Sequence, residues 1–93
     1  MTTLTKSQRS KAFPAAKVVI LERYTLTEVP KWSDIGTTVR SALRQAMLAE
    51  LRRGENDDVA DYLATHEEEA DQILHKRTKS LRESRGRGIQ LLS

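Results

Sequence analysis

Hydrophobic side chains recur in three patterned segments of the chain. Residues 17–26 are rich in β-branched and aromatic side chains, and this composition with alternating apolar positions predicts a strand. Residues 33–53 and residues 57–82 instead repeat apolar side chains at helical spacing. The pattern therefore predicts a mainly α-helical fold, in which one short β-strand precedes an antiparallel helical hairpin.

The helix predicted over residues 33–53 has a signal at each end. Ser33 is a suitable N-cap, because its hydroxyl can accept from a free backbone N–H. Gly54 fits the left-handed residue that closes a helix. We expect Arg40 and Arg44 on the face opposite the apolar stripe, exposed to solvent. The predicted stripe comprises Ile35, Val39, Ala42, Leu43 and Ala46.

The second predicted helix, over residues 57–82, begins near Asn56 or Asp57, either of which can cap it. The turn at residues 54–56 is short, so the two helices are expected to lie antiparallel. Tyr62 lies beside the apolar stripe of this helix. The stripe itself comprises Val59, Leu63, His66, Ala70, Ile73, Leu74 and Leu81.

The size of the chain indicates how these elements are organised. Its 93 residues suffice for one small domain, expected over residues 15–83, with a thin core. A mobile basic arm is expected over residues 1–14, and a basic tail with an apolar end over residues 84–93. A single strand leaves unpaired backbone groups along both edges, which predicts pairing across a two-fold axis in a homodimer.

The net charge of +3 conceals three blocks of opposite sign. Residues 1–53 carry ten bases and four acids, residues 54–71 carry eight acids and no base, and residues 72–93 carry six bases and one acid. Segregated charge of this kind favours a polyanionic partner for the basic ends. Helices that carry acids early and bases late, in accord with their dipoles, also account for the last two blocks.

Catalytic and metal-binding patterns are not evident, so we expect a protein that is not an enzyme and uses no cofactor. The chain has no cysteine, which excludes thiolate zinc sites and a cysteine nucleophile. His66 and His75 would point in roughly opposite directions on one helix, and His66 is expected to pack in the core or an interface. The longest apolar run, residues 18–21, is too short to span a membrane, and a cytoplasmic location is expected.

Basic and hydroxyl side chains define a candidate DNA-binding surface. Arginine can contact phosphates or guanine edges with two hydrogen bonds, and hydroxyls donate to phosphates. Helical spacing aligns four such residues on one face of the first predicted helix, and two further bases share one face of the predicted strand. The candidate nucleic-acid-binding residues are Lys17, Arg23, Thr37, Arg40, Ser41 and Arg44.

Residues 37–44, with the sequence TTVRSALR, resemble the second helix of ribbon-helix-helix antitoxins and repressors. This resemblance implies a dimeric two-stranded ribbon that reads DNA, with residues 17–25 as the strand and the acidic residues 55–71 as the part that neutralises a toxin. In that family a full helix separates the strand from the segment that residues 37–44 resemble. Here only residues 27–32 intervene, with Pro30 among them.

Residues 35–43 are also similar to the recognition helix of small winged helix-turn-helix repressors. This similarity implies a first helix over residues 26–33. The residues that it places against DNA bases are Thr37, Thr38, Arg40 and Ser41.

Together these observations predict a small bacterial or phage DNA-binding regulator, with the antitoxin of a toxin–antitoxin pair as one specific form. A protein partner would then contact the acidic helix over residues 57–74 or the apolar end of the chain. The candidate partner-binding residues are Tyr62, His66, Ile89, Leu91 and Leu92. The alternative is an interaction module that binds no nucleic acid, such as a phage-encoded inhibitor of a host protein.

Overall fold

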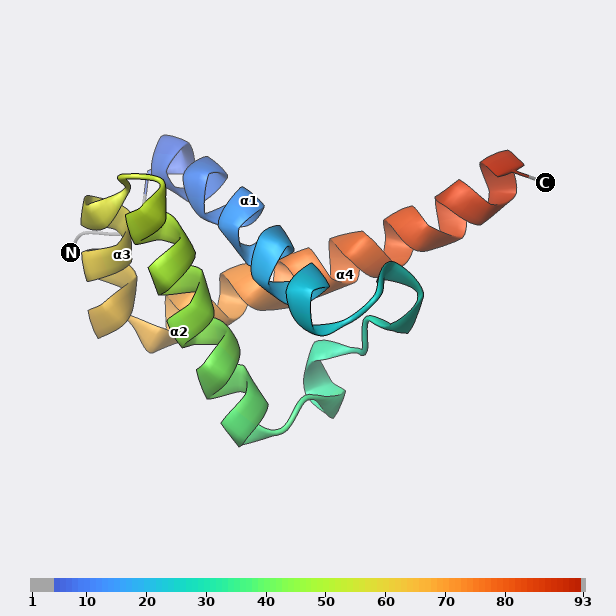
Figure 1. The fold of residues 1–93 in the computed structure, drawn as a ribbon, viewed down its shortest axis with the longest axis horizontal. Coiled ribbons are helices and arrows are strands. Elements are labelled where there is room, and N and C mark those ends of the chain that lie inside the picture. The colour runs from blue at the N-terminus through green and yellow to red at the C-terminus, as the bar shows by residue number, and fades with distance from the viewer. Residues whose placement is uncertain (1–4, 93) are drawn as a thin grey trace.

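Residues 5–92 form four α-helices and two 3₁₀ turns (Figure 1). The structure is a computed structural model that describes the backbone of residues 5–92 and the side chains of residues 5–84. The elements are α1 (Lys6–Arg23), η1 (Leu26–Glu28), η2 (Trp32–Asp34), α2 (Thr37–Arg53), α3 (Asp57–Thr65) and α4 (Glu67–Leu92).

Helix α1 includes residues 17–23 of the segment predicted as a strand, and residues 24–26 lead into η1. The prediction of a strand over residues 17–26 is therefore wrong, and residues 5–92 contain no strand. Thr5 and Gln8 begin the helix with a capping box, in which each side chain bonds the backbone of the other residue. The helix buries one face against the rest of the molecule, and this burial outweighs the modest β preference of its branched residues. The buried residues of α1 are Ala12, Ala15, Ala16, Val19 and Ile20.

Pro14 lies inside α1 with its ring exposed. Because proline has no backbone N–H, the carbonyl of Ser10 lacks its usual helical donor. Residues 6–14 of the predicted arm thus form the first half of α1, and the predicted domain boundary at residue 15 falls within this helix.

The connection between α1 and α2 folds two large apolar side chains inward. Trp32 in η2 and Ile35 after it are both buried, and Val29 ahead of them is 1% exposed. Ser33 therefore lies in η2 and caps nothing, which corrects its assignment as the N-cap. Helix α2 begins at Thr37, with Gly36 in the N-cap position, because Ile35 is held in extended backbone to bury its side chain.

The turn between α2 and α3 closes α2 at Arg53, which confirms the predicted end of that helix. The left-handed residue is not Gly54, whose φ is −87°, but Glu55, whose φ is +64°. The N–H of Glu55 donates to the Arg52 carbonyl at 3.1 Å, and the N–H of Asn56 donates to the Leu51 carbonyl at 2.8 Å. This pair of bonds is the Schellman motif, with glutamate where glycine is usual.

The second predicted helix is interrupted at His66, so the predicted two-helix hairpin consists of three helices. Thr65 Oγ1 donates to the Tyr62 carbonyl at 3.0 Å, and His66 Nδ1 lies 2.8 Å from the same oxygen. Such local side-chain bonds compete with the helical hydrogen bonds and end α3. The three glutamates of residues 67–69 then supply the negative charge that favours the N-terminus of α4.

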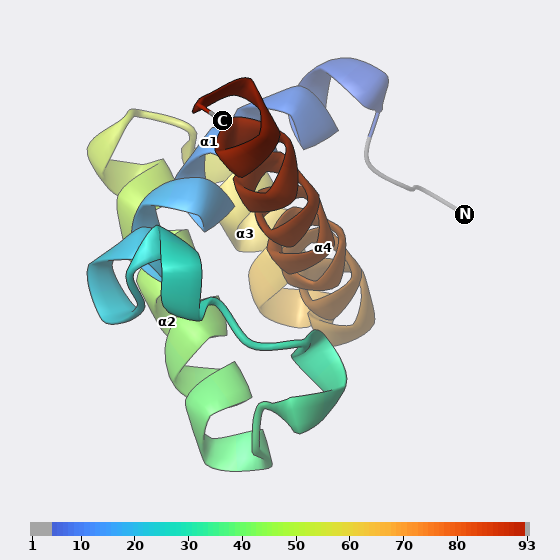
Figure 2. The same ribbon diagram turned by 90° about the vertical axis from the view of Figure 1, so that its right-hand side faces the viewer.

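Helix α4 is the longest element, and α1 and α2 both pack against it (Figures 1 and 2). Its final turns extend beyond the other helices, so the long dimension of the 45 × 28 × 25 Å molecule follows this helix. Residues 84–92 of the predicted tail continue the backbone of α4. Burial confirms the predicted stripe of residues 57–82 except at His66, which is exposed.

The buried face of α2 differs from the predicted stripe. Leu43 is buried as expected, but Ala42 is exposed, and Val39 and Ala46 are only half-buried. The core contains Met47, Leu48 and Leu51 instead. The buried face is therefore turned by roughly 100° about the helix axis from the predicted one.

Candidate nucleic-acid interface

Arg40 lies on the face of α2 that packs against the rest of the molecule, and it contacts Trp32. Its Nη2 donates to the Trp32 carbonyl at 2.9 Å, and its Cζ lies 5.0 Å from the centroid of the Trp32 ring. Contact of a guanidinium with an aromatic ring is favourable, and the aliphatic stem covers apolar surface. Arg40 is therefore half-buried and not fully exposed as expected, and it contacts the η2 turn of its own chain, while its predicted contact with DNA stays a prediction.

Arg44 connects α2 to the start of α4. Its Nη1 lies 2.8 Å from Oδ1 of Asp71, and its Nη2 lies 3.9 Å from Oε2 of Glu67. The Arg44 side chain is only 16% exposed. Its guanidinium is therefore directed at acids of its own chain, and not toward solvent as the sequence pattern had indicated.

The remaining predicted DNA contacts are not brought together on one surface. Lys17 and Arg23 are exposed on α1, but six residues along a helix place them about 120° apart around its axis. Thr37 is exposed at the first residue of α2, whereas Ser41 is half-buried. The shared face expected of Lys17 and Arg23 depended on the strand and is absent with it.

Tyr62 and His66, both predicted to contact a partner, stack on each other beside the junction of α3 and α4. Their ring centroids are 3.9 Å apart, and the ring planes differ by 5°. The Tyr62 hydroxyl donates to Oε1 of Glu69 at 2.9 Å. Desolvation, and next the hydrogen bond to Glu69, raise the pKa of Tyr62 above its usual 10.0. His66 is exposed, so the expectation that it packs in the core is wrong, and the alternative of an interface stays a prediction.

The other predicted partner contacts, Ile89, Leu91 and Leu92, have side chains outside the described residues.

The second half of α4 carries exposed bases that are not among the predicted DNA contacts. Lys76 and Lys79 are exposed, one turn apart, and neither has an ion-pair partner among the described side chains. Arg77 and Arg82 are half-buried on the sides of the same helix. The sequence signal for this cluster was the basic block of residues 72–93.

Arg82 joins α4 to the connection between η1 and η2. Its Nη1 donates to the Val29 carbonyl at 2.7 Å, a contact between residues that are far apart in the sequence. The exposed Lys31 follows Val29 by two residues, so this contact holds a loop base near the bases of α4. We call Lys31, Lys76, Lys79 and Arg82 the basic end of the molecule. Arg82 lies about 120° around α4 from Lys76 and contributes through its contact with Val29. The acids next to these residues in the sequence are Glu28 and Glu83.

Acids dominate the opposite end of α4. The helix carries four acids over residues 67–71 and four bases over residues 76–82. Two arginines compensate part of the acidic charge, since Arg44 pairs with Asp71 and Arg52 Nη2 lies 3.0 Å from Oδ1 of Asp61. Within α4, the unpaired positive charge therefore lies in the second half of the helix.

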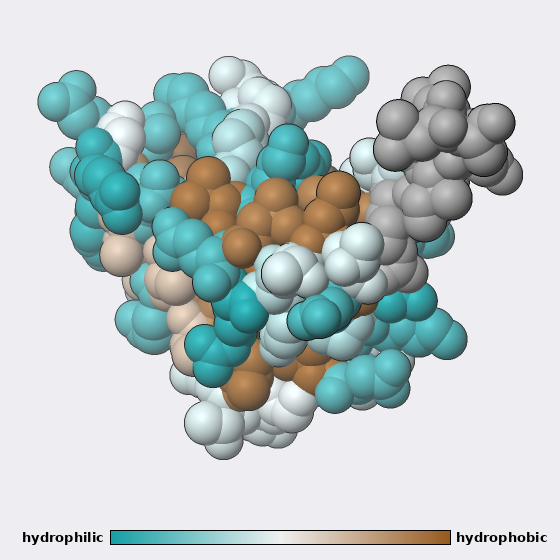
Figure 3. Space-filling model, turned by 45° about the vertical axis from the view of Figure 1, so that its right-hand side comes forward, coloured by the Kyte–Doolittle hydropathy of each residue, from teal (hydrophilic) through white to brown (hydrophobic). Residues whose placement is uncertain are grey.

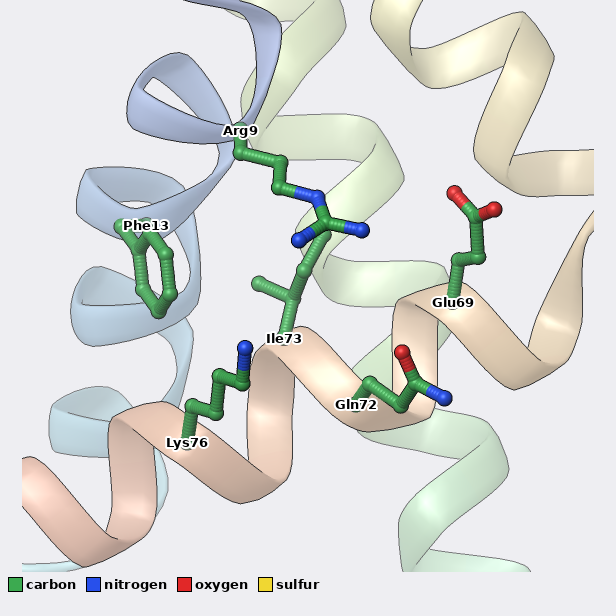
Figure 4. Close-up of a pocket in the computed structure, with 6 residues that line it drawn as sticks. All are labelled: Arg9, Phe13, Glu69, Gln72, Ile73 and Lys76. Atoms are coloured by element: carbon green, nitrogen blue, oxygen red, sulfur yellow. The ribbon is translucent and has the colours of Figure 1, made fainter. Parts of the chain in front are cut away.

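A small notch separates α1 from α4 near Lys76 (Figure 4). Arg9 and Phe13 of α1 face Glu69, Ile73 and Lys76 of α4 across it. The notch encloses about 10 Å³, which is room for about one water molecule and not for a substrate. Within the described residues, no group of three or more His, Cys, Asp or Glu side chains is placed to hold a metal ion.

No described helix combines the length and the apolar character needed to cross a lipid bilayer.

No protein-family model matches the chain, and comparison with curated proteins and with solved structures finds no significant similarity. The two family resemblances noted in the sequence are neither supported nor contradicted by these comparisons.

Proposed function

We propose that the protein is a small regulator that binds duplex DNA through the basic end, with α4 as the principal contact. The observation that carries this proposal is the pair of exposed, unpaired lysines at positions 76 and 79, which lie on α4 ahead of the final turns that extend beyond the other helices (Figure 1). An α-helix fits the major groove of B-form DNA, and lysines on its exposed face can reach the flanking phosphates.

The connection between η1 and η2 supports this proposal, because it adds a further base to the basic end. Because Arg82 holds the segment around Val29 against α4, Lys31 supplies a base from a second element. Two elements that approach the same nucleic acid fix its position better than one helix can. The acids at the other end of α4 would face away from the phosphates and orient the helix.

Salt dependence tests whether phosphate contacts drive binding. We expect a fluorescent generic duplex to bind the full chain at low salt, and its affinity to fall about a hundredfold or more between about 50 and 200 mM salt if about five phosphates are contacted. Fluorescence anisotropy measures both values. Absence of binding at low salt would contradict the proposal and leave the interaction module as the better description.

Matched charge reversals locate the binding surface. Lys76→Glu combined with Lys79→Glu should weaken binding by tenfold or more and reduce the salt slope by about two. Lys6→Glu combined with Lys17→Glu makes the same change of net charge on α1 and should alter affinity by less than about threefold. Equal losses in both pairs would show that the net charge, and not the basic end, determines binding. Circular dichroism checks that each variant keeps its helicity.

A further inference from the structure

Two open hollows lie between α1 and α2, one toward each end of the helix pair, and together we call them the groove. Lys11, Ala15 and Val18 line one end of it, and Glu22 with Ala46 line the other. Figure 3 views this side obliquely and shows hydrophobic surface, in brown, between hydrophilic flanks.

Val18 is the principal apolar side chain exposed in this groove. It is 38% exposed, and Leu26 is the only other large hydrophobic residue so exposed among the described side chains. On α2, Ala42 and Ala49 are exposed, and such small side chains let a second helix approach closely. The groove therefore presents an apolar centre that a helix can cover.

The exposed stripe of α1 along the groove carries charges of opposite sign at its two ends, while Glu50 of α2, which pairs with Arg53, and Arg23 also line the groove. Lys11 and Glu22 are both exposed, and neither has an ion-pair partner among the described residues. They are eleven residues apart, about three helical turns, so both lie on the same side of α1. One end of this stripe is therefore cationic and the other anionic.

We propose that this face binds a second copy of the chain, with the two α1 helices antiparallel across a two-fold axis. If the axis passes between positions 16 and 17, Lys11 of each copy faces Glu22 of the other, and Val18 of each faces Ala15 of the other. One arrangement thus forms both ion pairs and covers both valines. The stripe is self-complementary only in this antiparallel sense, which favours a second copy over an unrelated helix.

The proposed contact between the two copies is small, so we expect the dimer to be weak. The area buried by one stripe of α1 and the facing alanines of α2 is at the low end of the areas found in specific interfaces. We therefore expect a dissociation constant on the order of 10–100 µM. The ion pairs lie at the rim and contribute mainly to register, while Val18 contributes most of the buried apolar area.

Sedimentation of the full chain measures this association directly. We expect the mass to rise from 10.6 kDa toward twice that value as the concentration increases through the expected dissociation constant. Lys11→Glu or Glu22→Lys alone places like charges at both ends and should weaken the dimer tenfold or more. The double variant, Lys11→Glu with Glu22→Lys, restores opposite charges and should restore the dimer to within about threefold.

Two further variants distinguish loss of the proposed interface from unfolding and from a general effect of charge. Val18→Glu should leave a monomer with unchanged helicity. Lys17→Glu, on the other side of α1, should leave the dimer unchanged in strength. A chain that stays monomeric at every concentration overturns the proposal, and so does a double variant that stays as weak as the single ones. This test uses no DNA, so its outcome is independent of the proposed function.

Discussion

Arg44 is the residue that most directly couples two helices, because its guanidinium on α2 reaches Asp71 on α4 at 2.8 Å. The pair is partly buried, with 16% of the arginine side chain and 32% of the aspartate side chain exposed. Removal of either partner leaves a poorly solvated charge, whereas removal of both does not. Arg44 therefore stabilises the packing of α2 on α4 through Asp71, and its predicted contact with DNA stays a prediction.

Arg44→Ala should lower the free energy of unfolding by about 1–3 kcal/mol. Asp71→Asn should do the same to a smaller degree, and the double variant should lose less than the sum of the two. Urea denaturation of the four proteins measures this coupling. Strict additivity, or an Arg44→Ala variant as stable as the parent, would show that the contact contributes nothing.

At the scale of the elements, the turn that joins α2 to α3 stores conformational strain in one residue. Glu55 has a left-handed backbone, with φ at +64°, while the adjacent Gly54 adopts a backbone that any residue can adopt. A side chain in the left-handed region is unfavourable by about 1 kcal/mol. Gly54 in the sequence therefore correctly predicted where α2 ends, but the left-handed residue of the turn is Glu55 and not Gly54.

Glu55→Gly should raise the free energy of unfolding by about 0.5–1 kcal/mol, because glycine relieves this strain. Gly54→Ala is the matched control and should change stability little, since a Cβ there meets only the Asn56 side chain amide at 3.3 Å and backbone oxygens at ordinary contact distances. Thermal unfolding distinguishes the two variants. The opposite order, with Gly54→Ala strongly destabilising and Glu55→Gly neutral, would place the left-handed residue at position 54.

At the scale of the whole molecule, one hydrogen bond ties the connection after α1 to the far part of α4. Arg82 bonds the carbonyl of Val29, and Trp32 three residues later is 7% exposed. The chain has a single tryptophan, so its fluorescence reports on this connection alone. The proposed basic end depends on the same contact, because it keeps Lys31 beside α4.

Arg82→Ala should lower the free energy of unfolding by about 1–2 kcal/mol and shift the Trp32 emission to longer wavelength, because a buried carbonyl loses its donor and the connection loosens. Lys79→Ala, at an exposed position without an ion-pair partner, should leave both measurements unchanged. If the emission of the Arg82→Ala variant matches that of the parent, the connection is held by its apolar side chains alone.

Local patterns in the sequence determined a large part of this architecture. The end of α2 at Arg53 and the buried stripe from Val59 to Leu81 follow from spacing and capping, which depend on nearby residues. The basic block of residues 72–93 likewise indicated the region where the exposed lysines of α4 lie. These three features could be predicted because helix ends, the spacing of apolar residues and blocks of charge are all set by residues close together in the sequence.

Only the tertiary structure decided the state of residues 17–26 and the buried face of α2. The first segment suits a strand or a helix by composition, and it forms a helix because its alanines and branched residues bury against α2 and α4. On α2, apolar residues occupy two adjoining stripes, and the long stems of Arg40 and Arg44 can cover apolar surface. Spacing alone cannot choose between such stripes, since the choice depends on Trp32 and Asp71, which other segments bring into contact.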